Sequence, residues 1–442
     1  MTRSLDSLAS VPLNFEAVEI MNRKPSLLVI FLTVFIDLIG FGIVVPLVPI
    51  YSRHYGAGGF MIGAIIASFS AMQFVFSPIW GRLSDRHGRR PILLISTAGA
   101  ALSYVLFAIG SGLADHTAAL AVMLVSRIFA GICGGNITVA QAYIDDITPP
   151  ENRSKRMGLI GMAFGLGFIF GPAISGVALT LFGATGPGWV AAALCAANFL
   201  LAFTILVESL QPASTLAARR PRFTQWGHTL SQPRLGALIV IFFLATFAFS
   251  CFESTLPLLV NDNFNLGLTV DETKPAMTVI YLFIYCGLIG AIIQGGAIGR
   301  LVKLFGEPKL IFISLVLLPF VKGSGQLVWS ELFHAAGWPW VKMLLVLALL
   351  AIGSSLTRPP VFGLLSNLTP ATEQGVTIGV AQSAGSLARI LGPLFAATLY
   401  MRIPELPYVV CGVISIAAGA LAIQRLGGGA KVLESGQPAA DS

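Results

Sequence analysis

Long apolar segments separated by short polar turns dominate the pattern of this chain. A helix that crosses the hydrocarbon core of a membrane needs about 20 mainly apolar residues, and twelve windows of that kind occur in the sequence. The predicted spans cover residues 27–50, 60–80, 92–112, 118–143, 158–181, 188–207, 236–260, 277–298, 309–328, 341–365, 376–400 and 406–424. The pattern therefore predicts an all-α membrane protein with twelve transmembrane helices.

Composition and charge support this class and add an orientation. Hydrophobic residues make up 55% of the 442 positions and charged residues only 11%, whereas soluble domains carry about 25% charged residues. With both termini cytoplasmic, 19 of the 27 Lys and Arg residues fall in cytoplasmic segments, where basic residues accumulate. The net charge of +7 reflects this bias, so it does not indicate nucleic-acid binding. The basic residues outside cytoplasmic segments are Arg53, Lys274, Lys322 and Arg402 near the outer side, and Arg127, Lys342, Arg358 and Arg389 within spans.

An internal repeat divides the chain into two halves. The repeated residues, always 221 positions apart, are Thr148 and Thr369, Pro149 and Pro370, Gly158 and Gly379, Gly171 and Gly392, and Pro172 and Pro393. Many secondary transporters are built from such repeats. We therefore predict two six-helix bundles over 25–207 and 236–425. A cytoplasmic segment over 1–24, a linker over 208–235 and a tail over 426–442 complete the prediction.

Cysteine and histidine positions argue against a metal or cofactor site. All five cysteines lie inside predicted spans without metal-ligand spacing, and the histidines lie in loops or at span ends. Residues 1–24 contain no cleavable signal sequence, so we expect the first span to be retained. No phosphate-binding loop or nucleophile constellation occurs, and we therefore expect neither an enzyme nor a cofactor-dependent protein.

The turn between the second and third spans carries the most distinctive motif. Residues 81–91 read GRLSDRHGRRP, which contains one acid, four arginines and two glycines. Gly81 and Gly88 suit a tight turn, and Pro91 suits the first turn of the next helix. A weaker copy occurs over 299–306, where Lys303 stands in place of the acid.

Several motifs together resemble the major facilitator superfamily over nearly the whole chain. The 81–91 turn is similar to that family's loop signature, and residues 126–131 (SRIFAG) resemble its span 4 signature. Residues 167–172 (GFIFGP) resemble the span 5 signature of proton-coupled exporters. Residues 35–42 (FIDLIGFG), followed by Pro46 and Pro49, are similar to span 1 of tetracycline/proton antiporters.

The resemblance implies a cytoplasmic gate built on the 81–91 turn. In such a gate, Asp85 docks on the cytoplasmic end of span 11 and Arg89 bridges to an acid at the end of span 4. Asp145 and Asp146 both occupy that place, and the sequence leaves the choice open. One conformation keeps such a charged latch and the other breaks it. The residues assigned to the gate are Gly81, Asp85, Arg86, Gly88, Arg89, Arg90, Asp145 and Asp146.

Small residues in spans 5 and 11 predict close helix packing. The pairs Gly161/Gly165 and Gly167/Gly171 each place glycines one turn apart on a helix face, which lets backbones approach. Pro172 allows a bend in span 5. We expect span 5 to move against span 11, its counterpart, through Gly385, Gly392 and Pro393.

Charged residues inside spans are the candidates for coupling and substrate binding. Such residues are costly in a membrane and usually face a cavity or a partner. Asp37 and Glu253 are predicted proton or cation sites, because a carboxyl group removed from water favours its protonated form. Arg127 is expected to pair with Asp37. Arg358 and Arg389 either bind an anionic substrate or pair with Glu253. Weaker polar candidates that face a cavity are Gln73, Asn136, Gln141, Tyr281, Tyr285, Gln294 and Gln382.

These residues favour a secondary transporter, most simply a proton-coupled exporter of amphipathic drugs or metabolites. An organic-anion or metabolite carrier is the alternative, with the arginines binding substrate. The windows 277–298 and 309–328 contain no Asp, Glu or His, which argues against a tetracycline–metal complex as the substrate. We expect a monomer in a bacterial inner membrane whose partners are lipid, protons and a small-molecule substrate.

Overall fold

Helices make up all the regular structure that can be described. The computed structural model describes residues 25–149, 153–210, 222–264, 273–293, 297–305, 309–310, 313, 339–369 and 374–426. Nine helical segments within these residues are long and apolar enough to cross a membrane, and Ala276–Ile292 is a shorter apolar helix. The protein is therefore an integral membrane protein that crosses the bilayer several times. The segment 1–24 and nearly all of the predicted span 309–328 and of the tail lie outside the described residues.

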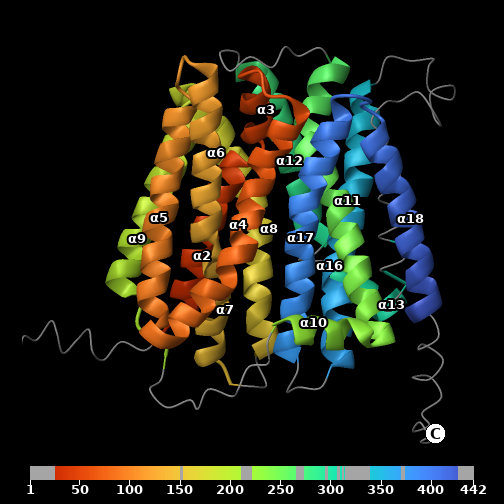
Figure 1. Cartoon of the computed structure of the whole chain (residues 1–442). Helices are drawn as coiled ribbons and strands as arrows, with labels where there is room; N and C mark the ends of the chain where they lie inside the picture. Colours follow the sequence, from red (N-terminus) through yellow and green to blue (C-terminus); the bar gives the residue numbers. More distant parts are fainter. Residues whose placement is uncertain are drawn as a thin grey trace, which may run out of the picture.

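The helices form two groups that stand side by side (Figure 1). The first group comprises α2 (Leu27–Val44), α3 (Leu47–His54), α4 (Gly59–His87), α5 (Arg89–Gly110), α6 (His116–Cys133), the 3₁₀ turn η1 (Gly134–Asn136), α7 (Ile137–Asp146), α8 (Arg153–Phe182) and α9 (Gly186–Ile205). The second group comprises α11 (Pro233–Phe264), α12 (Thr273–Ile292), α13 (Ile298–Phe305), α16 (Pro339–Leu368), α17 (Gln374–Tyr400) and α18 (Leu406–Leu426). A short helix, α10 (Arg222–Ser231), precedes the second group. We call the end that carries α3 the upper end and the end that carries α10 the lower end, as drawn in Figure 1.

Two predicted spans are broken by local backbone changes. The first divides between α2 and α3, where Pro46 removes a backbone N–H and its ring crowds the preceding turn. The fourth divides where η1 replaces α-helical geometry between α6 and α7. Such short 3₁₀ segments inside a helix often mark functional positions. Here the break brings Asn136 next to the charged residue of α2, as described below.

The 81–91 segment is almost entirely helical, which corrects the expected turn. Helix α4 runs through Gly81 to His87, and α5 starts at Arg89. Only Gly88 leaves helical geometry, with φ of 100°, a left-handed value that favours glycine. A Cβ atom at Gly81 would meet no other atom within 4 Å. The reversal therefore depends on Gly88 alone.

Glycine packing joins α2 to α8 inside the first group. A Cβ at Gly42 would lie 2.4 Å from the carbonyl oxygen of Gly167, and a Cβ at Gly171 would lie 2.5 Å from the carbonyl carbon of Gly42. A side chain at these positions would push the helices apart. Gly161 and Gly165, by contrast, face open space. Only one of the two predicted glycine pairs in this span therefore makes close helix contact.

The two groups meet along two seams, α4 with α17 and α8 with α12. This corrects the expectation that the fifth and eleventh spans form one moving contact. In the first seam, a Cβ at Gly63 would lie 2.6 Å from the carbonyl oxygen of Pro393. In the second seam, Gly176 faces the side chain of Met277. Gly392 instead faces α11 within the second group.

Candidate functional site

The first polar site lies where α2 passes the break between α6 and α7. Asn136 donates a hydrogen bond from Nδ2 to Oδ2 of Asp37 over 3.2 Å. Gln73 of α4 fixes the same break, because its Nε2 donates to the carbonyl oxygen of Gly134 over 2.9 Å. Asp37 as a whole residue is half-buried. One amide donor leaves this carboxylate with acceptor capacity for a proton or a cationic group.

Arg127 on α6 occupies a separate, aromatic pocket. Its guanidinium carbon lies 5.6 Å from the ring centroid of Tyr104 and 5.4 Å from that of Phe107, both on α5. These distances are typical of cation–π contacts. The residue is 2% exposed, and its Nε and Nη2 find no hydrogen-bond acceptor among the described residues. The contacts described for this guanidinium are therefore those with the aromatic rings of α5.

The predicted ion pair between Asp37 and Arg127 is wrong for this conformation. No ion pair joins the two residues in the described structure, where Asp37 bonds Asn136 instead. The reason is geometric. Arg127 and Asn136 are nine positions apart on the same span, which corresponds to about 13 Å of rise at 1.5 Å per residue. Asp37 lies level with Asn136, whose amide takes the place of the expected arginine in the described structure.

The second group contains three half-buried charges on three helices. Glu253 lies on α11, Arg389 on α17 and Arg358 on α16. The charges of Glu253 and Arg389 attract one another, while Arg389 and Arg358 repel. Arg389 also donates from Nη2 to Ser386 Oγ over 3.3 Å. Of the two partners left open for Glu253, Arg389 is therefore the one that the structure brings near.

Arg358 reaches across the boundary between the groups. Its guanidinium carbon lies 5.7 Å from the ring centroid of Phe164 on α8 and 5.7 Å from that of Phe362 on its own helix. Phe164 belongs to the first group. Because any separation of the groups near this point changes that contact, Arg358 is placed to respond to a conformational change.

The weaker polar candidates are dispersed. The Tyr285 hydroxyl donates to the carbonyl oxygen of Leu344 over 3.2 Å and so joins α12 to α16. Tyr281 on the same helix is 61% exposed. Gln141 and Gln382 are half-buried, and Gln294 lies outside the described residues. Among this set, the hydrogen bonds therefore place Gln73, Asn136 and Tyr285 in helix-to-helix contacts, which is the ordinary role of polar residues in spans.

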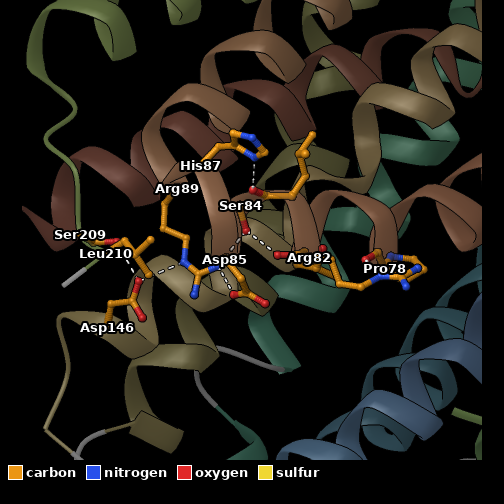
Figure 2. Close-up of polar contacts among 12 residues, drawn as sticks. Pro78, Arg82, Ser84, Asp85, His87, Arg89, Asp146, Ser209 and Leu210 are labelled. Atoms are coloured by element: carbon orange, nitrogen blue, oxygen red, sulfur yellow. Dashed lines mark hydrogen bonds and ion pairs between the residues drawn. The ribbon is translucent and has the colours of Figure 1, made fainter. Parts of the chain in front are cut away.

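A network around Arg89 ties the ends of three helices together (Figure 2). Its Nε donates to Asp146 Oδ2 at the end of α7 over 3.1 Å. Its Nη1 donates to Asp85 Oδ1 over 2.5 Å and to Ser84 Oγ over 2.7 Å, both near the end of α4. Arg89 is 6% exposed, so the bonds to it are shielded from water. Of the two acids that end the fourth span, Asp146 is the one that contacts Arg89.

Glu208 belongs to the same cluster, although its role was not predicted. Its Oε1 accepts the backbone N–H of Arg89 over 2.8 Å, and its Oε2 accepts that of Arg90 over 3.0 Å. The neighbouring Ser209 hydroxyl donates to Asp146 Oδ2 over 3.0 Å. The available signal in the sequence was weak: a single acid directly after the sixth apolar segment.

The other members of the predicted gate lie around this network. Arg90 turns away from it. Its Nη2 donates to the carbonyl oxygen of Phe203 over 2.8 Å, and its guanidinium lies over the Phe203 ring. Arg86 is exposed. The arginines of the motif therefore have different environments, and only Arg89 is buried.

At the upper end, an ion pair joins the two groups. Arg53 of α3 contacts Asp262 of α11 through Nη2 and Oδ1 over 2.9 Å, with both side chains about one-third exposed. Asp262 Oδ2 also accepts a hydrogen bond from the Tyr400 hydroxyl of α17 over 2.9 Å. One carboxylate thus holds one side chain from each group. We call Arg53, Asp262 and Tyr400 the upper clamp.

Known proteins resemble this chain over most of its length. The sequence profile of the Major Facilitator Superfamily matches residues 30–393 and 297–427. The class E tetracycline resistance protein of Escherichia coli is 32% identical over 398 residues, which cover 87% of this chain and 90% of that protein. Human major facilitator superfamily domain-containing protein 10 is 30% identical over 422 residues, covering 84% and 86%. The crystal structure of the human organic anion transporter MFSD10 (TETRAN) superposes with a TM-score of 0.64 at 25% identity, covering 90% of this chain and 98% of that one.

Proposed function

Because the chain belongs to the Major Facilitator Superfamily of secondary transporters, we propose that it exports an amphipathic small molecule in exchange for protons. The observation that carries this proposal is one half-buried carboxylate in each helix group, Asp37 and Glu253. Neither carboxylate has a direct ion-pair partner in the described structure. Each can therefore take a proton or a cationic substrate group without first breaking a salt bridge.

The topology that accompanies this proposal has twelve spans, with both termini in the cytoplasm. Two six-helix bundles over 25–207 and 236–425 move about a site between them, and the segment over 208–235 connects them. The lower end is then the cytoplasmic one, because the basic segment Arg82–Arg90 lies there. A bacterial inner membrane fits the bacterial relatives, and we propose a monomer. Labelling of single cysteines placed near each terminus from either side of the membrane tests the orientation.

The Arg89 cluster serves as the cytoplasmic gate in this scheme. Asp85 is held by Arg89 in the observed conformation. In the outward-open state, Asp85 docks on the lower end of α17, and Arg89 keeps its position through Asp146. In the observed conformation, by contrast, the upper clamp holds the upper end closed. Alternating access then consists of exchanging one set of contacts for the other.

Proteoliposomes with an acidic interior test proton coupling. Protons that leave the lumen should drive accumulation of ethidium, an amphipathic cationic dye. We expect Asp37→Asn and Glu253→Gln each to abolish accumulation driven by the pH gradient, because an amide cannot take up a proton. The matched control is Asp115→Asn, which changes an exposed acid at the start of α6. Unchanged coupling in Asp37→Asn would remove Asp37 from the mechanism, and no accumulation by the unmodified protein would reject dye export.

A second candidate function is carriage of an organic anion. Two arginines, Arg358 and Arg389, face a single acid in the second group, which leaves one positive charge uncompensated there. A solved relative at 25% identity is described as an organic anion transporter. Uptake of a labelled organic anion, lost in Arg358→Gln and Arg389→Gln, together with no dye accumulation, would favour this function over the first.

A further inference from the structure

The start of α5 is held from outside its own helix. The first turn of a helix leaves its backbone N–H groups without partners. In α5, Arg89 and Arg90 have such groups, whereas Pro91 has no N–H to offer. The two carboxylate oxygens of Glu208 accept both available donors, one each. Glu208 lies 119 positions further along the chain, so this cap is a tertiary contact.

The charge balance favours an acid at this point. A helix N-terminus carries partial positive charge, and Arg89 and Arg90 add two full charges beside it. Glu208 Oε1 also accepts the backbone N–H groups of Ser209 and Leu210, each over 3.0 Å. The carboxylate therefore accepts four backbone donors in all, which fixes its own position as well as that of α5.

The backbone at Gly88 is shaped around the same carboxylate. A Cβ atom there would lie 2.4 Å from Glu208 Oε2, and the φ of 100° excludes most side chains independently. Glycine at this position thus allows both the reversal between α4 and α5 and the close approach of Glu208. The turn and its cap form one unit.

The segment that carries Glu208 also holds the partner of Arg89. Ser209 Oγ donates to the Asp146 oxygen that accepts from Arg89 Nε. One residue before Glu208, the carbonyl oxygen of Val207 accepts a hydrogen bond from the Tyr143 hydroxyl of α7 over 2.8 Å. Residues 207–209 thus contact both sides of the Arg89–Asp146 ion pair: the backbone that bears the arginine and the helix that bears the aspartate.

We propose that Glu208 is a positioning residue of the cytoplasmic gate, which it serves by holding the start of α5 so that Arg89 meets Asp146. The inference rests on the gate role proposed above. It extends that gate to the segment that leaves α9 towards the linker between the two groups. A shift of this segment is then transmitted directly to the backbone of Arg89.

Distance measurements between spin labels test the proposal. One label pair, at Ala114 and Arg402, spans the upper ends of the two groups, and another, at Thr204 and Gln424, spans the lower ends; all four positions are exposed. We expect Glu208→Ala and Asp146→Asn each to change the population ratio of the upper-closed and lower-closed states. The change should be about threefold or more and in the same direction for both variants. The double variant should shift them no further than the stronger single one, because residues that act through one contact are not additive.

The matched control is Asp115→Ala. Asp115 caps α6 at the opposite end of the same group, where its Oδ1 accepts the N–H of Thr117 over 2.9 Å. This variant also removes an acid from a helix N-terminus, but it does not touch the gate, so the populations should stay unchanged. Glu208→Asp, which keeps the charge on a shorter side chain, should shift the populations less than Glu208→Ala does. A population shift in Asp115→Ala as large as that in Glu208→Ala would overturn the proposal.

Hydrogen exchange separates failure of this inference from failure of the gate. Glu208→Ala should speed exchange of the Arg89 and Arg90 amides, and unchanged exchange would overturn the positioning role. Additive effects of Glu208→Ala and Asp146→Asn would overturn it as well. If Asp146→Asn alone leaves the populations unchanged, the gate is wrong. Faster amide exchange in Glu208→Ala would then still establish that Glu208 positions Arg89.

Discussion

The two ends of the molecule are held by different kinds of contact. At the upper end, the Arg53–Asp262 ion pair and the α4–α17 backbone contact join one helix group to the other. At the lower end, the side-chain partners described for Arg89 (Ser84, Asp85 and Asp146) all belong to its own group. Contacts between groups must break when the groups separate, whereas contacts within a group can survive. The observed conformation is thus clamped at the upper end, whereas the Arg89–Asp146 contact at the lower end can persist when the groups separate.

The charged contacts at the upper end are also more exposed to solvent than those at the lower end. The side chains of Arg53 and Asp262 are 30% and 33% exposed, whereas that of Arg89 is 8% exposed. Half-exposed ion pairs contribute little free energy and can open at small cost. Removing one partner of a buried charge costs more, because the other charge is left without compensation. A reversible clamp and a permanent brace therefore use the same residue types at different depths.

The largest change should come from breaking the upper contact sterically. Gly63→Leu places a side chain against the Pro393 carbonyl, which a Cβ alone would approach to 2.6 Å. Overpacking costs about 1–3 kcal/mol, and 1.4 kcal/mol is a tenfold change in population. We expect the closed upper end to lose population by about tenfold, seen as longer distances between labels at Ala114 and Arg402.

The control for this variant is Gly161→Leu on α8. A Cβ at Gly161 meets nothing within 4 Å, so the same change in volume should leave the label distances unaltered. Equal shifts in both variants would show that bulk in a span, rather than the α4–α17 contact, controls the conformation.

Removal of the clamp carboxylate should have a smaller effect. Asp262→Ala deletes the partner of both Arg53 and Tyr400. A half-exposed pair is worth about 1 kcal/mol or less, so the closed upper end should lose up to about fivefold in population. The charge exchange Arg53→Asp with Asp262→Arg should recover part of this loss in the same label measurement. Failure to recover any of it would indicate that the ion pair is incidental to closure.

At the lower end, Arg89→Lys should act mainly on stability. Lysine keeps the charge but cannot donate from Nε to Asp146 and from Nη1 to Asp85 in one fixed geometry. The loss of one net hydrogen bond costs about 1 kcal/mol, which we expect as a lower unfolding temperature in detergent. Arg86→Lys, at an exposed position, is the matched control and should not change it. An equal unfolding temperature in Arg89→Lys and Arg86→Lys would contradict the role of Arg89 as a brace.

A rise in ionic strength should have the smallest effect of these changes, and it should act more on the upper end than on the lower end. Raising salt from about 0.15 M to 1 M shortens the Debye length from about 8 Å to 3 Å. Exposed pairs feel this screening more than buried ones. Upper-end label distances should therefore lengthen in part of the population, while those from Thr204 to Gln424, near the lower cluster, change less. Greater salt sensitivity at the lower end would reverse the comparison.

Much of the fold followed from the sequence, because the bilayer imposes simple rules on length and charge. Predicted spans correspond to described helices over most of the chain, and the family assignment is confirmed by the matched profile. Breaks within spans were less predictable. Pro46 offered a signal for the first break, and the consecutive glycines Gly134 and Gly135 offered one for the second. The contacts of this turn with α2 and α4 appear only in the tertiary structure.

The candidate site shows the same division. The sequence offered Asp37, Glu253 and the membrane arginines as candidates, because charges are rare in apolar segments and stand out. It failed on their pairing, since Asp37 meets Asn136 and Arg127 lies between aromatic rings. Pairing depends on the height and rotation of each helix, and small differences in either move a side chain past its expected partner.

The sequence by itself determined that this is a multi-span membrane protein of one transporter family, and which few charges lie inside it. Hydrophobicity and charge act residue by residue, so these properties can be read along the chain. Only the tertiary structure decided that Asp146 contacts Arg89, that α17 packs along α4, and that Glu208 caps a helix 119 positions away. Contacts between distant segments depend on how whole helices pack, and no local stretch of sequence specifies that arrangement.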